Sequence, residues 1–139
     1  MANFSTYLEK ELLDHVFRNL AYSAPVTVYV GLASSTATDV ELEAGTLTNE
    51  ITGYTGNRPL VTFSAPADDG EGREKIANTA LIDFTNMPAC TVKYAFVSDS
   101  ATKSAGNLLV WCPLTVQKTV NAGDTFRLPE DTGLTVKLA

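Results

Sequence analysis

The sequence predicts a mainly β fold: an antiparallel, jelly-roll-like β-sandwich with one amphipathic helix at its N-terminus. Three observations predict it. Residues 78–139 consist of short apolar runs separated by turn residues. Residues 26–32 alternate strictly between apolar and other side chains, as a half-buried strand does. A helical repeat of apolar residues occurs near the N-terminus. Short strands at this spacing are typical of sandwiches and related all-β folds.

The N-terminal helix is predicted by an apolar stripe. Its residues recur at every fourth position: Leu8, Leu12, Val16 and Leu20, with Leu13 and Phe17 widening the stripe. Charged residues fill the opposite face. Thr6 followed by Glu9 fits a capping box, and Asn3 or Ser5 could cap instead. Pro25 disfavours helix at the preceding residue, so we expect the helix to end within residues 19–23.

The strands follow in order. After residues 26–32 the chain becomes rich in Ser, Thr, Gly and acids over residues 33–59, which predicts a long loop with a short strand near 40–42. A polar loop is expected at 66–75. Strands are predicted at residues 60–63, 81–84, 91–98, 107–111, 125–128 and 134–138. Residues 121–123 form a predicted hairpin connection with Gly123 in the left-handed conformation.

These elements fit one domain spanning residues 1–139. It would comprise a helical segment at 1–23 and a β-sandwich at 24–139 that carries the long loop 33–59. A chain of 139 residues can bury a single sizeable core.

Charge and hydropathy exclude several classes of partner. The formal net charge is −6 and the ten basic residues are scattered, so we expect no nucleic acid partner. No apolar run approaches the roughly 20 residues that span a bilayer, and the acidic N-terminus does not resemble a secretory signal. We therefore expect no membrane partner.

We also expect no catalytic residues, no cofactor and no metal. His15 is the only histidine, it lies beside Asp14 on the predicted helix, and no nucleophile motif accompanies it. Cys90 and Cys112 lie in or beside predicted strands. They could form a disulfide if those strands are neighbours, although two reduced thiols are the commoner arrangement.

Acidic and glycine clusters have simple structural explanations. Residues 68–72 (DDGEG) lack the alternate spacing of a calcium loop and indicate a solvated turn. Asp39, Glu41 and Glu43 resemble a glycosidase pair only loosely. Gly53 and Gly56 are an incomplete dinucleotide fingerprint with no helix after them.

Two regions are candidates for contact with a partner. The helix stripe is too apolar to remain in water, so we expect it to pack on the sandwich or on another subunit. The loop 33–59 contains two residue types that are enriched at interfaces. The candidate interface residues are Leu8, Leu12, Val16, Leu20, Tyr54 and Arg58.

Several segments, taken in this order and spacing, resemble a family of small structural proteins of tailed bacteriophages, described as tail-fibre-like or head-decoration (cement) proteins. They are residues 2–5 (ANFS), 11–18 (ELLDHVFR), 24–26 (APV), 29–32 (YVGL), Glu50-Ile51, Gly53-Tyr54 and Arg58, 78–80 (NTA) with 82–84 (IDF), 106–109 (GNLL) and 118–124 (KTVNAGD). The resemblance implies a virion component without enzymatic activity.

We therefore expect a capsid decoration or cement protein that bridges neighbouring capsomers, because a receptor-reaching shaft normally needs a longer or repetitive chain. Its expected partners are the major capsid protein or other virion proteins, and we expect a homo-oligomer located in the virion. The alternative within the same class is a small tail or fibre-associated protein. A carbohydrate-binding module is the alternative from another class, and it would require a row of exposed aromatic residues.

Overall fold

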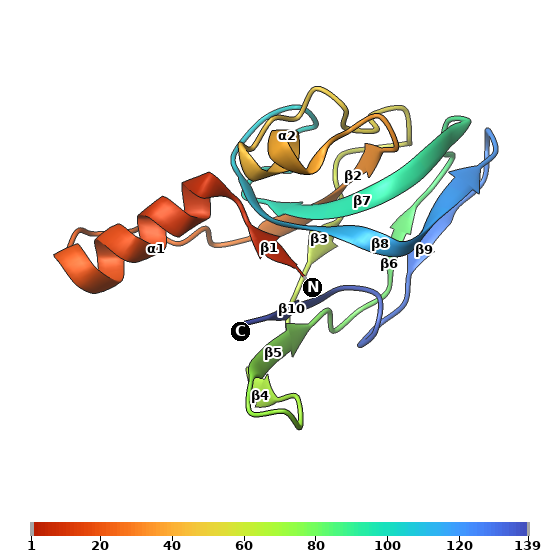
Figure 1. Cartoon of the computed structure of the whole chain (residues 1–139). Coiled ribbons are helices and arrows are strands. Elements are labelled where there is room, and N and C mark those ends of the chain that lie inside the picture. Colours follow the sequence, from red (N-terminus) through yellow and green to blue (C-terminus); the bar gives the residue numbers. More distant parts are fainter. Residues whose placement is uncertain (1, 139) are drawn as a thin grey trace.

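A computed structural model describes residues 2–138 and has the predicted mainly antiparallel β fold with an N-terminal helix (Figure 1). Helix α1 (Thr6–Arg18) leads into the largest sheet, whose order is β1-β8-β7-β2-β3. The strands of this sheet are β1 (Asn3–Phe4), β2 (Val28–Ser34), β3 (Leu60–Val61), β7 (Cys90–Ser98) and β8 (Leu108–Val120). All of its strand pairs are antiparallel.

Two smaller sheets form the layer beneath this sheet (Figure 1). One has the order β10-β5-β4, from β10 (Thr135–Lys137), β5 (Glu74–Ala77) and β4 (Ala67–Asp68). The other pairs β6 (Ile82–Phe84) with β9 (Phe126–Leu128). The main core lies between the layers, where the alternating apolar side chains of all three sheets meet. Its fully buried members include Val30, Leu32, Ile82, Phe84 and Val92.

A second, smaller core covers the other face of the large sheet. Tyr94, Phe96 and Trp111 point to this side and pack under helix α2 (Asp39–Glu43) and the chain around it. The indole Nε1 of Trp111 donates to Glu43 at 3.1 Å, and the Tyr94 hydroxyl donates to Asp39 at 2.6 Å. Trp111 is therefore a core residue, and the acids of the 39–43 segment attach α2 to the sheet.

Helix α2 corrects the strand expected near residues 40–42. The side chain of Thr38 accepts from the backbone N–H of Glu41, and the Glu41 carboxylate accepts from the backbone N–H of Thr38 at 2.8 Å. This reciprocal capping box satisfies two N–H groups that a helix start leaves without partners. It starts a single helical turn that buries Leu42.

Other boundaries differ from the sequence prediction. The expected loop 66–75 contains β4 and the start of β5, which form a hairpin. Its exposed turn at residues 70–72 is closed by the side chains of Asp68 and Asp69, which accept from the backbone N–H groups of Gly70 and Glu71. Strand β8 continues to Val120. Gly123 has the predicted positive φ, 90°. However, the flanking strands do not pair with each other, because β8 pairs with β7 and β9 pairs with β6.

Cys90 and Cys112 are both free thiols. Cys90 lies opposite Val120 and Cys112 lies opposite Ala95, so their strands are neighbours but their positions are five residues apart along β7. That offset exceeds the reach of a disulfide. Burial raises the pKa of both thiols.

Candidate functional site

Helix α1 is anchored to the sheet only at its first turn. Strand β1 pairs with β8 immediately before the helix, with Asn3 opposite Trp111. Ser5 is completely buried, and its hydroxyl donates to the carbonyl of Leu108. The same oxygen accepts from the backbone N–H of Leu8 at 3.3 Å, so Ser5 is the N-cap. One side chain therefore fixes both the start of the helix and its direction.

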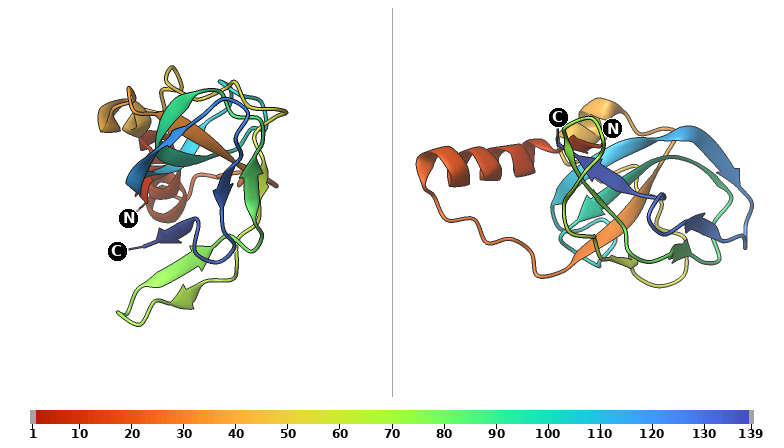
Figure 2. Two further views of the ribbon diagram at one scale, coloured as in Figure 1. Left: turned by 90° about the vertical axis from the view of Figure 1, so that its right-hand side faces the viewer. Right: turned by 90° about the horizontal axis from the view of Figure 1, so that it is seen from below.

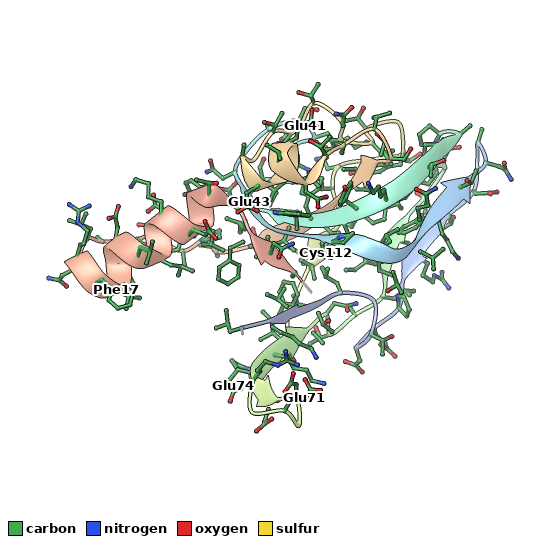
Figure 3. The ribbon with its side chains drawn as sticks, viewed as in Figure 1. Phe17, Glu41, Glu43, Glu71, Glu74 and Cys112 are labelled. Carbon is green, nitrogen blue, oxygen red and sulfur yellow. The ribbon has the colours of Figure 1, made fainter. Side chains whose placement is uncertain are left out.

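The rest of α1 projects away from the body. Figure 1 shows it extending from the sheet, and a view at right angles shows it accompanied only by the segment that follows it (Figure 2). No residue of α1 is buried. Val16 is 62% exposed and Phe17, at the free end (Figure 3), is 78% exposed. With Leu13 and Leu20, which are also exposed, they form an apolar surface that we call the helix tip.

The opposite face of α1 carries two ion pairs between residues four positions apart in the helix. Asp14 accepts from Lys10 and from Arg18, each at 2.7 Å, and these bonds lower the pKa of its carboxyl. Asn19 ends the helix in the left-handed conformation, within the expected range. His15 lies beside the Leu20 carbonyl at the exposed C-terminal end. The helix therefore has one polar face and one apolar face, and the apolar face of its outer half is uncovered.

A groove with a volume of about 420 Å³ lies next to the base of α1. We call it the apolar groove. One wall is the base of the helix with β1, the other is β5 with β10, and the large sheet forms the floor. Its lining includes Phe4, Leu8, Leu12, Phe63, Ile76, Val136 and Leu138, and Glu74 and Lys75 lie in the same wall. Because Leu8, Leu12 and Val16 follow one another at a spacing of four residues, the apolar groove continues directly into the helix tip.

The structure thus separates the six predicted contact residues into two groups. Leu8 and Leu12 line the apolar groove, and Val16 and Leu20 are exposed further along the chain. Tyr54 and Arg58 are only 4% and 2% exposed. The expectation that these two contact a partner is corrected, because their side chains are buried within the chain.

Arg58 holds the 50–58 segment against the end of the large sheet. Its guanidinium donates to both carboxylate oxygens of Glu50, at 2.7 and 2.8 Å. It also donates to the Ser98 hydroxyl at 3.0 Å and to the carbonyls of Ser100 and Ala105 at 2.9 Å each. Both side chains of this ion pair are fully buried. The role of this network is structural: it attaches the 50–58 segment to the large sheet, and we call it the Arg58 clamp.

Tyr54 is part of the main core. Its ring meets Phe84 edge-on at 5.0 Å, and the ammonium of Lys103 lies 3.8 Å from the ring centroid. Lys103 also donates to the carbonyls of Thr52 and Tyr54, at 2.8 and 2.6 Å. Burial raises the pKa of Tyr54 and lowers that of Lys103. Among the described residues, the Tyr54 hydroxyl is buried without a hydrogen-bond partner.

We expect Tyr54→Phe to leave the free energy of unfolding unchanged or to raise it by up to about 1 kcal/mol, because the change removes a buried hydroxyl that makes no hydrogen bond. Urea denaturation of the purified protein measures this. Tyr54→Ala is the control and should lower stability by about 3–5 kcal/mol, since it empties the space of a core aromatic ring. A loss above 1 kcal/mol for Tyr54→Phe would show that the hydroxyl has a partner.

The groove residues beyond the helix were missed by sequence reasoning. Phe63, Ile76 and Val136 belong to separate segments, and each is a single apolar residue in a short strand or beside one. The alternation around residues 134–138 predicts the strand that contains Val136. It does not predict that this strand forms one wall of a groove.

The acidic clusters carry no reactive arrangement. Asp39 and Glu43 accept from core aromatic side chains, and Glu41 caps its own helix. Within residues 2–138, no three His, Cys, Asp or Glu side chains come together as a group that could hold a metal ion. Neither helix in this part of the chain has the length and apolar character needed to cross a membrane.

Comparison with known proteins identifies one family. A search of individually curated proteins gives no match. The family model described as "Podophage GP4 fiber I protein gp80" matches residues 3–136, which includes β1, α1 and strands of every sheet, up to the middle of β10. Because the match covers nearly the whole chain, this chain belongs to the podophage GP4 fiber I protein gp80 family and is a bacteriophage structural protein.

Proposed function

We propose that this protein is a non-enzymatic fibre subunit of a tailed-phage virion, which joins its neighbours through the helix tip and the apolar groove. The observation that carries the proposal is the projection of an amphipathic helix from a rigid β body with its apolar face uncovered. Contiguous exposed apolar surface of this kind marks an interaction site. The family is described as a fibre protein, and this favours the fibre over the capsid surface as the location of the chain.

The architecture suits a connecting role. The three sheets share a continuous core, and the buried Arg58–Glu50 pair fixes the longest connection, which favours a body that stays folded as one unit. The chain does not need to be long enough to form a shaft, since a connector only has to bridge two neighbouring proteins. Its partners would be other virion proteins.

The number of copies per virion tests this proposal. Quantitative mass spectrometry of purified particles, scaled to the portal and major capsid proteins, should give about a dozen to a few dozen copies, as expected for a protein that follows the symmetry of the tail. An averaged cryo-electron microscopy map should place the chain in a fibre. Hundreds of copies on the head would contradict the fibre role and indicate a capsid decoration protein. Absence from purified particles would contradict both.

A further inference from the structure

We propose that two copies of this protein form a reciprocal dimer in which the helix tip of each copy occupies the apolar groove of the other. This inference deepens the proposed function and rests on it, because it names the neighbour that α1 contacts. The helix tip is Leu13, Val16, Phe17 and Leu20, and the apolar groove is the surface lined by Leu8, Leu12, Phe63, Ile76, Val136 and Leu138.

The first argument is that one chain carries both halves of the contact. The helix projects from its own body, so its tip does not fill its own groove (Figure 1). The base of α1 forms one wall of the apolar groove. A second helix that enters the groove therefore lies along the first, and antiparallel packing places each tip at the base of the other helix. Two-fold symmetry makes both contacts identical.

The second argument is the area. An exposed Leu, Val or Phe side chain carries on the order of 100 Å² of apolar surface. One helix tip with the matching groove surface would bury on the order of 800 Å², counting both sides, which is the size of a weak or lattice contact. The reciprocal arrangement doubles this value to roughly 1,600 Å², the size of a standard stable interface. A partner that offered only a groove or only a helix would leave half of the surface uncovered.

The third argument is charge. The last turn of α1 carries the basic residues His15 and Arg18, and Arg18 is paired with Asp14 of the preceding turn. The wall of the groove that faces the incoming helix belongs to β5 and β10, and its charged lining residues are Glu74 and Lys75. On the adjoining hairpin turn, Asp69 is paired with Arg73 and Lys137, and Glu71 is paired with Arg73. Figure 3 shows Glu71 and Glu74 on this hairpin, apart from the body. Within this lining, Glu74 is the carboxylate that the basic side chains of an incoming helix end would meet.

The test is the oligomeric state of the purified full chain, measured by sedimentation velocity over a dilution series. The wild type should be a dimer. Val16→Asp should weaken dimerisation by roughly 100-fold or more, because two-fold symmetry buries the new carboxylate twice. Leu138→Asp, which alters an exposed position in the groove, should act in the same direction. The matched control is Val116→Asp on β8, an exposed valine outside the proposed contact, which should remain dimeric.

A mixing experiment identifies the tip–groove pairing. Val16→Asp keeps an intact groove and Leu138→Asp keeps an intact tip, so a mixture should form a heterodimer with one intact contact, tighter than either variant alone. Thermal melts of all variants should match the wild type, which separates lost association from lost folding. A wild-type monomer, a dimer that survives both substitutions, or a mixture no tighter than its components would overturn the proposal. The fibre role is tested separately by the copy number in virions, which does not depend on whether the purified protein forms this dimer.

Discussion

Replacing Arg58 with methionine is expected to lower the free energy of unfolding by about 3–5 kcal/mol. The substitution removes five hydrogen bonds and leaves the Glu50 carboxylate buried without its counter-ion. Ser98 and the carbonyls of Ser100 and Ala105 lose their donor at the same time. An unpaired buried charge costs far more than the intact pair contributes. Urea denaturation, followed by tryptophan fluorescence from Trp111, measures the loss.

Two further variants test this explanation. Arg58→Lys keeps the charge but cannot reproduce the planar two-bond contact with Glu50, so its stability should lie between wild type and Arg58→Met. The double variant Arg58→Met/Glu50→Leu should be more stable than the sum of the single effects predicts, because it removes the unpaired carboxylate. If Arg58→Met lost less than 1 kcal/mol, the guanidinium would have to be solvated, and Arg58 would again be a candidate for partner contact.

The same residue shows why the sequence could not assign this role. Arg58 lies in a Gly- and Thr-rich segment that is typical of surface loops. Two of its acceptors are carbonyls 42 and 47 positions further along the chain. Backbone carbonyls leave no trace in residue identity. Composition therefore predicted an exposed contact residue where the fold has a buried clamp.

Alternation predicted the longer strands because it depends on a local property. Residues in β2 and β7 point alternately to two different cores, so their pattern follows directly from the pleat. The β4–β5 hairpin gave no such signal, since its residues are mostly charged and exposed and it is stabilised by pairing with β10. The sequence pattern did not reveal helix α2, because Val40 and Leu42 also fit a short strand and the single turn that begins at the Thr38–Glu41 capping box is too short to show a helical repeat.

The helix side of the candidate site was predictable from the sequence, because it too depends on a local pattern. The stripe on α1 follows from helical spacing, and the structure confirms the helix. How much of the stripe is covered depends on Ser5, which directs the helix away from the sheet. The second wall of the groove comes from residues more than 60 positions away, in β5 and β10. A one-dimensional pattern cannot show that these segments meet the helix base.

Gly31→Ala is expected to lower the free energy of unfolding by about 3 kcal/mol, at the upper end of the range for overpacking a core. Gly31 on β2 lies directly opposite Phe96 on β7, and the Phe96 ring folds over it. A Cβ at position 31 would lie 2.1 Å from Cζ of that ring and 2.5 and 2.7 Å from its two Cε atoms. The ring has nowhere to move, because it is 1% exposed and the Arg58 guanidinium lies 5.2 Å from its centroid. Chemical denaturation measures the loss.

A double variant with a smaller side chain at position 96 tests whether the loss in Gly31→Ala comes from the clash with the Phe96 ring. Phe96→Leu alone should be destabilising, since it opens space above Gly31 and beside the Arg58 clamp. Combined with Gly31→Ala, it should recover part of the loss, because the new methyl group then occupies the space that the ring has left. If the two losses were simply additive, the methyl group and the ring would not be in contact. The loss in Gly31→Ala would then need another cause, since Gly31 does not have the positive φ that favours glycine, and the pairing of β2 with β7 would not depend on the fit between Gly31 and the Phe96 ring.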